Sequence, residues 1–419
     1  MSPRGLYSLA VTALLPWALL HLLWRSRRQP EYRRHWGERL GFTRLPQARP
    51  VIWIHAVSVG ETRAAQPLIA ALLRSHPGAN ILLTHMTPTG RQTGTELFGD
   101  RVQQVYLPYD LPWAVTRFLD HYRPSLGLVM ETELWPNLVA ACRQRRLPLL
   151  LVNARLSERS ARRYGRWAAL TAEALAGLTA IGAQGEEDAA RLRHLGAPAV
   201  QVCGNLKYDI APAPAQLELV PDFRARCGDR PVCLCASTRD GEEALILEAW
   251  RRAQPAALLV IVPRHPQRFD EVAALTARLG FRLQRRSDGQ PVAANTEVWI
   301  GDSMGEMFAY YGASDLAFVG GSLLDFGSQN LIEPCAVGTP AVIGPSTFNF
   351  ADAAREALAA GAVVQVTDAD DLMASWKRLL ADPEARQAMA AAGRSFVARH
   401  QGATARTLAL AAPYLPTGG

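Results

Sequence analysis

Short apolar runs alternate with stretches of helical pattern along the chain from residue 50 onward. Each apolar run is three to six residues long and is followed by a stretch of helical composition, which is typical of parallel strands joined by helices. In the first half the predicted strands are Val51–Ala56, Ile81–Thr84, Val102–Leu107, Leu126–Met130, Leu149–Val152 and Ala180–Ala183. The pattern predicts an α/β domain whose parallel sheet has helices on both faces.

The alternation stops over residues 211–231, where Pro212, Pro214, Pro221 and Pro231 favour an interdomain linker. It then resumes with predicted strands Val232–Ala236, Leu258–Val262, Val298–Ile300, Leu316–Val319, Ala341–Ile343 and Val363–Val366. We therefore expect two doubly wound domains, residues 46–210 and 232–419, facing a central cleft. Open parallel sheets bind ligands at the carboxyl ends of their strands, so the loops after these strands are the candidate sites.

The segment from Gly5 to Trp24 carries no Asp, Glu, Lys or Arg and is long enough to span a bilayer as a helix. Pro16 and His21 interrupt it, so a shallow or kinked insertion stays open beside a spanning one. A buried core helix and a cleaved signal peptide are the alternatives. The basic run follows the apolar stretch and no clear cleavage site is present, which favours a retained anchor over residues 1–45. Arginines on its C-terminal side place the main body on the cytoplasmic side.

The net charge of +7 is concentrated next to this segment and does not point to nucleic acid. Residues 1–45 hold eight arginines and two glutamates, so the remaining 374 residues are nearly neutral. A basic collar of this kind attracts anionic lipid head groups. The six cysteines are scattered, without a CxxC pair or a zinc spacing, so we expect reduced thiols, a cytosolic body and no bound metal.

Polar residues follow three of the predicted elements in the first domain. Glu61, in the sequence HAVSVGE, begins a helix after the first strand, where it can act as a general base or merely cap the helix. Glu131 and Glu133, in ETELWPN, follow another strand, and we expect one of the two carboxylates to be functional. Lys207, in GNLKYD, is either a cleft cation or a surface lysine. Residues 87–90 (TPTG) favour capping.

Five strand ends in the second domain carry polar or glycine-rich loops. They are STRDGEE at 237–243, PRHPQR at 263–268, GDSMGE at 301–306, GGS at 320–322 and SQNLIEP at 328–334. Arg264 can grip a phosphate, and glycines let backbone amides face a ligand. Neither a GxGxxG fingerprint after a strand nor a P-loop is present, so the pattern indicates a nucleotide site of another kind.

These motifs in this order, from HAVSVGE to GPSTFNF at 344–350, resemble the 3-deoxy-D-manno-octulosonic acid (Kdo) transferases of Gram-negative bacteria. The resemblance runs from the N-terminal segment to near the C-terminus. It implies a GT-B fold and an inverting transfer of Kdo from CMP-Kdo to the glucosamine disaccharide of a lipid A precursor at the inner membrane. It also implies that Glu61 is the general base and that Glu131 and Lys207 stabilise the transition state.

The same resemblance assigns the CMP contacts to three stretches of the second domain. They are Pro263 and Arg264; Met304, Gly305 and Glu306; and Asn330, Leu331, Ile332 and Glu333. The sequence departs from the family at Ser328, where a second glycine is common, so a Cβ lies close to the expected nucleotide.

The hypothesis drawn from these residues is a direct displacement without a cofactor. Arg264 and helix-terminal amides would offset the charge on departing CMP, so no metal is expected. Two other classes stay open at this point: a GT-B-like sugar-nucleotide epimerase or hydrolase, and a non-catalytic membrane-associated binder of nucleotide or lipid. The sequence leaves open the number of Kdo units added, the acyl-chain preference and the oligomeric state.

Overall fold

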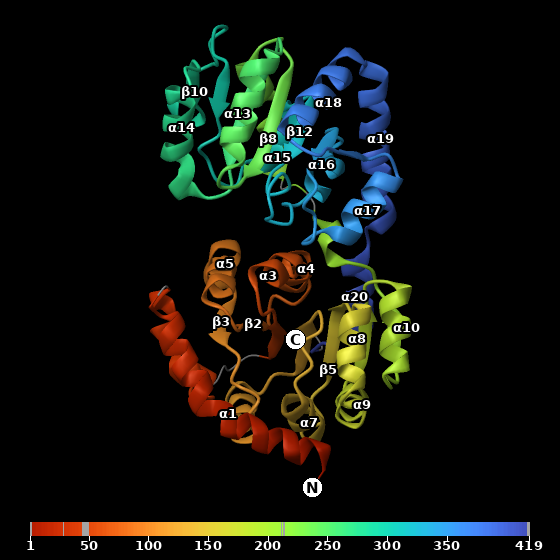
Figure 1. The fold of residues 1–419 in the computed structure, drawn as a ribbon. Helices are drawn as coiled ribbons and strands as arrows, with labels where there is room; N and C mark the ends of the chain where they lie inside the picture. The colour runs from red at the N-terminus through yellow and green to blue at the C-terminus, as the bar shows by residue number, and fades with distance from the viewer. Residues whose placement is uncertain (1, 28, 44–49, 211, 213, 417–419) are drawn as a thin grey trace. The chain divides into compact units, whose positions relative to one another are not determined.

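The computed structural model describes residues 2–27, 29–43, 50–210, 212 and 214–416, which form two compact units (Figure 1). The N-terminal unit comprises residues 1–209 and 400–419, and the C-terminal unit comprises residues 210–399. This division differs from the predicted one, because the last 20 residues belong to the N-terminal unit rather than to a domain 232–419. The anchor segment, predicted as a separate region 1–45, is also part of that unit.

Seven parallel strands form the sheet of the N-terminal unit, in the order β3-β2-β1-β4-β5-β6-β7. The strands are β1 Val51–His55, β2 Asn80–His85, β3 Gln103–Tyr106, β4 Leu126–Met130, β5 Leu149–Ala154, β6 Ala180–Ala183 and β7 Val200–Val202. Their side chains divide between two apolar clusters: Trp53 packs with Phe118 and Tyr122, whereas Ile52 and Ile54 belong to the other. Burial on both faces explains why these strands appear in the sequence as unbroken apolar runs.

Helices cover this sheet and close the unit. They are α1 Pro3–Arg25, α2 Trp36–Arg39, α3 Val59–Ala64, α4 Gln66–Ser75, α5 Pro88–Phe98, α6 Pro112–Tyr122, α7 Pro136–Gln144, α8 Glu158–Gly165, α9 Ala168–Ala176, α10 Glu186–His194 and α20 Ala403–Ala411. Short 3₁₀ turns are η1 Pro30–Arg33, η2 Gly99–Arg101, η3 Leu206–Asp209 and η6 Ala412–Tyr414. The carboxylate of Asp209 accepts from the backbone N–H groups of Gly402 and Thr404, which fastens α20 beside η3.

The C-terminal unit has a second parallel sheet of seven strands, in the order β10-β11-β9-β8-β12-β13-β14. The strands are β8 Val232–Thr238, β9 Leu258–Pro263, β10 Leu283–Arg285, β11 Val298–Ile300, β12 Leu316–Val319, β13 Ala341–Ile343 and β14 Val363–Gln365. All twelve predicted strands are therefore present, and β7 and β10 were not predicted. Both of these are three-residue strands at the edge of a sheet with half-buried or exposed residues.

The helices of this unit include the segment predicted as a linker. They are α11 Pro214–Glu218, α12 Val220–Cys227, α13 Glu242–Ala253, α14 Phe269–Arg278, α15 Met307–Ala313, α16 Ile332–Val337, α17 Ala351–Ala359, α18 Ala369–Ala381 and α19 Pro383–His400, with 3₁₀ turns η4 Pro266–Arg268 and η5 Arg286–Asp288. Pro214 and Pro221 stand in the first turns of α11 and α12, where proline is favoured. Phe223 of α12 is fully buried against Trp299 and Tyr310, so the 211–231 linker prediction was wrong for this part.

All six cysteines are free and buried, in agreement with the predicted reduced thiols. Cys233 and Cys235 lie on one face of β8 and fill the same apolar cluster. Within the part of the chain that the structure describes, no group of His, Cys, Asp and Glu is arranged to hold a metal ion.

Candidate active site

Glu61 stands in the first turn of α3, directly after the carboxyl end of β1. Ser58 caps this helix and accepts a hydrogen bond from the Glu61 N–H at 3.4 Å. In return the Glu61 carboxylate accepts from the Val57 N–H at 2.9 Å and from the Ser58 hydroxyl at 3.0 Å. The Glu61 side chain therefore caps the helix, which was the alternative to a role as general base in the sequence analysis. It is nearly buried, with 8% of its surface exposed.

Burial raises the pKa of Glu61 from 4.5 to about 8. The neighbouring charge of Glu131 is the next largest cause, Glu133 adds to it, and the hydrogen bonds from Val57 and Ser58 oppose it. A carboxyl group with a pKa near the working pH is suited to proton transfer, because it accepts a proton readily and is still partly ionised. The capping role thus does not exclude a chemical one.

Glu131 is the first residue after β4 and has a left-handed backbone, with φ of 57°. Its N–H donates to the Val152 carbonyl oxygen of β5 at 2.9 Å, which continues the sheet past the end of β4. Non-glycine residues pay of order 1–3 kcal/mol for sparsely populated backbone conformations, and such residues cluster at functional sites. Glu133 is half-buried, and burial raises its pKa while the neighbouring Trp135 side chain opposes the rise.

Lys207 is half-buried in η3, which packs against α3, the helix that carries Glu61. Asn153 at the end of β5 holds this turn in place. Its side-chain oxygen accepts from the Leu206 N–H at 3.0 Å, and Gln184 donates to its carbonyl oxygen at 3.0 Å. Asn153 is fully buried with φ of 53°, and its Nδ2 has no hydrogen-bond partner among the described residues.

Asn153 was not singled out from the sequence as a site residue. The available signal was its place as the first residue of NARLSERS at the end of a predicted strand, where an asparagine tolerates the left-handed conformation better than most residues. The N-terminal unit therefore brings Glu61, Glu131 and Glu133 into electrostatic contact, with the Lys207 turn packed against the same helix.

In the C-terminal unit Arg264 follows β9 directly. Its backbone N–H donates to the Thr238 carbonyl oxygen at 3.0 Å, and its Nε donates to Oε1 of Gln329 at 3.2 Å. The PRHPQR loop and the SQNLIEP loop thus meet at the carboxyl end of the sheet. Gln329 orients Arg264, a role that the sequence did not indicate.

Asn330 organises the start of α16. Its side-chain oxygen accepts from the Ile332 N–H at 3.1 Å, and its Nδ2 donates to Glu333 at 3.2 Å. Leu331 and Ile332 have fully buried side chains, with 0% and 1% exposed, so their side chains serve the core rather than a ligand. Asn330 and Glu333 are the half-buried polar members of this stretch.

Met304, Gly305 and Glu306 form the turn before α15. Met304 is 57% exposed, and Gly305 has φ of 79°, a conformation that a residue with a Cβ rarely adopts. Glu306 pairs with Arg286 at 3.1 Å, while its Oε2 is buried and has no partner within the described chain. A buried acceptor of this kind lies in a stretch that the resemblance assigns to CMP.

Two fully buried glutamates, Glu242 and Glu243, accept hydrogen bonds from the loops at the carboxyl end of the second sheet. Glu242 accepts from the backbone N–H groups of Gly321, Leu323 and Arg239 at 2.7, 3.0 and 2.8 Å. Its pKa is raised by burial, and these hydrogen bonds oppose the rise. Glu242 thereby fixes the backbone of the GGS loop, which the sequence did not reveal.

The second glutamate, Glu243, accepts hydrogen bonds from both terminal guanidinium nitrogens of Arg268, at 2.7 and 3.1 Å, and from the Thr238 hydroxyl at 2.7 Å. Arg268 is therefore occupied within the protein. Arg268 therefore does not contribute to the anion site suggested by STRDGEE and PRHPQR, and Arg239 and Arg264 are the arginines that remain at these two strand ends.

The chain matches two family models. One describes 3-deoxy-D-manno-octulosonic-acid transferase (kdotransferase) and covers residues 34–210, and the other describes glycosyl transferases group 1 and covers residues 245–396. A 3-deoxy-D-manno-octulosonic acid transferase from Bordetella pertussis is 47% identical over 97% of this chain and 98% of its own length. A protein of the same name from Haemophilus influenzae is 39% identical over 98% and 99%. This chain belongs to the Kdo transferase family.

Solved structures of low sequence identity share the fold of this Kdo transferase. A glycosyltransferase from Rickettsia africae has a TM-score of 0.56 at 14% identity and covers 89% of this chain and 100% of its own. A UDP-GlcNAc 2-epimerase from Neisseria meningitidis has a TM-score of 0.53 at 15% identity and covers 87% and 99%. The predicted GT-B fold is confirmed, and because epimerases share it, the fold by itself does not select the reaction.

Ser328, the departure from the family pattern, adopts φ of 68° in this Kdo transferase and is 1% exposed. Its N–H donates to the Gly321 carbonyl oxygen at 2.6 Å, so the loop keeps the backbone conformation that glycine adopts freely. The Ser328 hydroxyl donates to the Gln329 carbonyl oxygen at 3.0 Å. The loop thus accommodates the added Cβ at a backbone cost and without losing Asn330 or Glu333.

Proposed function

We propose that this enzyme is an inverting glycosyltransferase that moves Kdo from CMP-Kdo to the glucosamine disaccharide of a lipid A precursor. The observation that carries the proposal is Glu61, a nearly buried carboxyl group at a strand end whose pKa is raised to about 8. It has two further glutamates in electrostatic contact, in a chain that belongs to the Kdo transferase family.

In the proposed reaction the ionised Glu61 takes the proton of an acceptor hydroxyl while that oxygen attacks the anomeric carbon of Kdo. The new glycosidic C–O bond forms as the bond from the anomeric carbon to the CMP phosphate oxygen breaks, and CMP leaves with the bonding electrons. One displacement inverts the anomeric configuration. Glu131 and Lys207 are proposed to stabilise the charge that develops in the transition state.

The donor is proposed to bind at the carboxyl end of the second sheet. Arg264, oriented by Gln329, supports this because a guanidinium offsets the negative charge of the leaving phosphate. Asn330 and Glu333 are paired at 3.2 Å and offer a polar pair to the nucleotide sugar. The Met304–Glu306 turn adds an exposed backbone at Gly305.

We propose that the reaction needs neither a cofactor nor a metal ion, because Arg264 and helix-terminal amides supply the compensating charge. We also propose that the enzyme acts at the bacterial inner membrane with its catalytic units on the cytoplasmic side. Support comes from α1, an apolar helix of 23 residues, and from the arginines that follow it, because basic segments are attracted to the anionic cytoplasmic leaflet.

The test is a mass-spectrometric transfer assay with purified full-length protein, CMP-Kdo and a tetraacylated lipid A precursor, with and without EDTA. A product heavier by one or more Kdo units supports the proposed reaction and counts the additions, and equal product with EDTA supports the metal-free step. Absence of product from folded protein that binds CMP would contradict the proposal. A parallel reaction with UDP-GlcNAc tests the epimerase alternative.

A further inference from the structure

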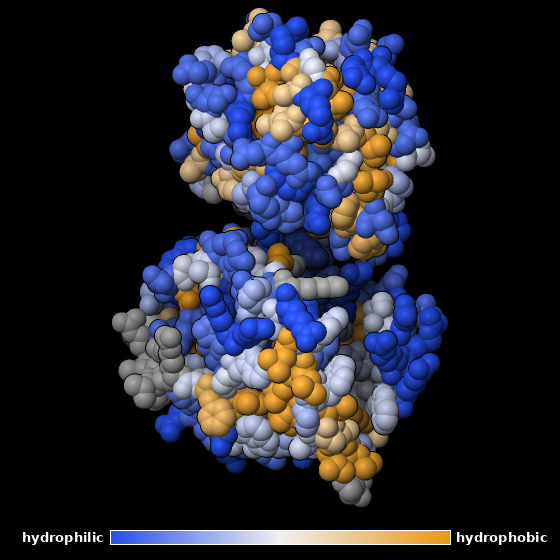
Figure 2. Space-filling view, turned by 60° about the vertical axis from the view of Figure 1, so that its left-hand side comes forward, coloured by the Kyte–Doolittle hydropathy of each residue, from blue (hydrophilic) through white to orange (hydrophobic). Residues whose placement is uncertain are grey.

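Helix α1 has one face on the N-terminal unit and one face turned outward. Its half-buried or buried residues recur at helical spacing, at Arg4, Ser8, Val11, Leu15, Ala18 and Leu22. The outward face carries large apolar side chains with exposed fractions of 45–64%: Leu6, Leu9, Leu14, Trp17, Leu20, Leu23 and Trp24. Figure 2 shows hydrophobic side chains gathered on the face of this unit along which α1 lies.

The N-terminal end of α1 is fastened to the unit by polar contacts. The Ser8 hydroxyl donates to Oδ1 of Asn137 at 2.8 Å, and the Tyr7 hydroxyl is hydrogen-bonded to the Asp110 carboxylate. Arg4 pairs with Glu173 of α9 at 3.2 Å. These three contacts all lie within the first two turns of the helix.

Asp110 and Asn137 are buried residues next to the candidate active site. The Asp110 carboxylate accepts from the backbone N–H groups of Asn137 and Leu138 at 2.9 and 2.8 Å, so it caps α7. Helix α7 begins directly after the loop that carries Glu131 and Glu133. The first turns of α1 therefore contact Asp110 and Asn137, the residues that fix the start of α7 directly after the loop with Glu131 and Glu133.

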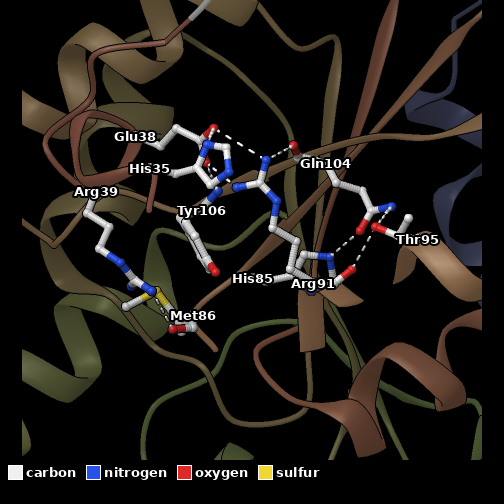
Figure 3. A network of polar contacts seen from close by, with 9 residues as sticks. All are labelled: His35, Glu38, Arg39, His85, Met86, Arg91, Thr95, Gln104 and Tyr106. Carbon is white, nitrogen blue, oxygen red and sulfur yellow. Dashed lines mark hydrogen bonds and ion pairs between the residues drawn. The ribbon is translucent and has the colours of Figure 1, made fainter. Parts of the chain in front are cut away.

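The chain after α1 is fastened to the same unit (Figure 3). Glu38 pairs with both terminal nitrogens of Arg91, at 2.6 and 3.4 Å, and accepts from the Tyr106 N–H of strand β3 at 2.9 Å. The buried Arg39 donates to the Met86 carbonyl oxygen at 3.1 Å and lies 3.9 Å from the centre of the Tyr106 ring. Both ends of α1 are thus bound to one folded unit.

These contacts are incompatible with a helix that crosses the bilayer. At about 1.5 Å per residue, Ser8 and Arg25 lie roughly 25 Å apart along the axis. In a spanning helix Ser8 and Tyr7 would sit near the far side of the ~30 Å hydrocarbon core, away from a catalytic unit in the cytoplasm. Spanning would break both hydrogen bonds and leave Asp110 without its phenol partner.

We propose that α1 lies in the plane of the membrane surface, with the N-terminus on the same side as the catalytic units, and that its outward face binds an anionic lipid bilayer. The outward face is apolar enough to enter the interface, and Trp17 and Trp24 stack on His21 at 5.2 and 5.8 Å in a group typical of the head-group region. Arg25, Arg27 and other exposed arginines flank it and complement anionic head groups.

This inference rests on the membrane attachment proposed above but not on the donor or the acceptor. The test is labelling of the Ser2→Cys variant of the full chain with a membrane-impermeant maleimide, in right-side-out spheroplasts and in inverted inner-membrane vesicles. Ser2 is exposed and all six native cysteines are buried, so background labelling is low. The matched control is Glu158→Cys, at an exposed site on α8.

We expect both variants to be labelled in inverted vesicles and protected in spheroplasts. Labelling of Ser2→Cys in spheroplasts, with Glu158→Cys still protected, would show that α1 crosses the bilayer and would overturn the inference alone. Recovery of the protein in the soluble fraction would instead overturn the membrane attachment, and the in-plane inference with it.

Discussion

Replacing Glu61 by glutamine keeps the capping contacts and removes only the titration. The amide oxygen can accept from the Val57 N–H, and the amide nitrogen can donate to the Ser58 hydroxyl, in place of the contacts seen at 2.9 and 3.0 Å. In the wild type the folded-state pKa is raised from 4.5 to about 8, so the folded protein holds this proton more tightly than the unfolded chain. Wild-type stability should therefore fall as the pH rises from about 4.5 to about 8.

The magnitude follows from the shift. A rise from 4.5 to about 8, at about 1.4 kcal/mol per pKa unit, corresponds to about 5 kcal/mol. Because the side chain is only 8% exposed, solvent screening reduces this little. We expect Glu61→Gln to match the wild type near pH 4.5 and to exceed its stability increasingly up to pH 8, by on the order of 10 °C in the Tm of the transition that includes this unit.

The assay is thermal unfolding of both proteins in detergent at intervals from pH 5 to 9. Glu158→Gln is the matched control, because Glu158 is an exposed carboxylate of the same unit with a surface ion pair to Arg162. It should follow the wild-type curve. Identical pH profiles for the wild type and Glu61→Gln would refute the raised pKa, and with it the argument that Glu61 is tuned for proton transfer.

Three further substitutions test the C-terminal unit. Ser328→Gly removes a left-handed backbone cost of about 1–2 kcal/mol, while glycine adds about 0.5–1 kcal/mol of unfolded-state entropy. We expect a net gain in unfolding free energy of up to about 1 kcal/mol, seen as a higher Tm, and a lower Tm would contradict the strain. Arg268→Ala leaves the buried Glu243 without its cation, so denaturant unfolding should show a loss of about 3–5 kcal/mol, and a loss below about 1 kcal/mol would contradict the buried pair. Gly320→Ala places a Cβ 2.5 Å from the Ser237 carbonyl oxygen and should lower the free energy of unfolding by about 1–3 kcal/mol in the same assay. The control Gly165→Ala adds a Cβ at a helix position with no neighbour within 4 Å and should not destabilise the protein. Equal effects of the two substitutions would contradict the packing argument.

The sequence predicts the central strands well because most of them are buried on both faces. Runs such as Leu126–Met130 and Leu316–Val319 coincide with the observed strands residue for residue. The two missed strands, Val200–Val202 and Leu283–Arg285, lie at sheet edges and include polar residues, so no apolar run marks them. The prolines near residue 214 favour a linker by composition, but proline is equally compatible with the first turn of a helix, which is where Pro214 and Pro221 lie.

The candidate site was predictable where chemistry lies at a strand end and not where it depends on tertiary packing. Glu61 and Glu131 follow recognisable strands, and the structure places them in electrostatic contact. The roles of Asn153 and Glu242 arise from a left-handed backbone and from burial against loops distant in sequence, at Leu206 and Gly321. Neither property follows from residue type and spacing alone.

The most direct measurement of the central claim is the single-turnover rate of Kdo transfer from CMP-Kdo to the lipid A precursor, compared among the wild type, Glu61→Gln and Glu158→Gln. If Glu61 is the general base, Glu61→Gln should be slower by about 10²–10⁴-fold while folded and still able to bind CMP, and Glu158→Gln should match the wild type. Transfer by Glu61→Gln within a few-fold of the wild type would contradict the assignment of this carboxylate as the catalytic base.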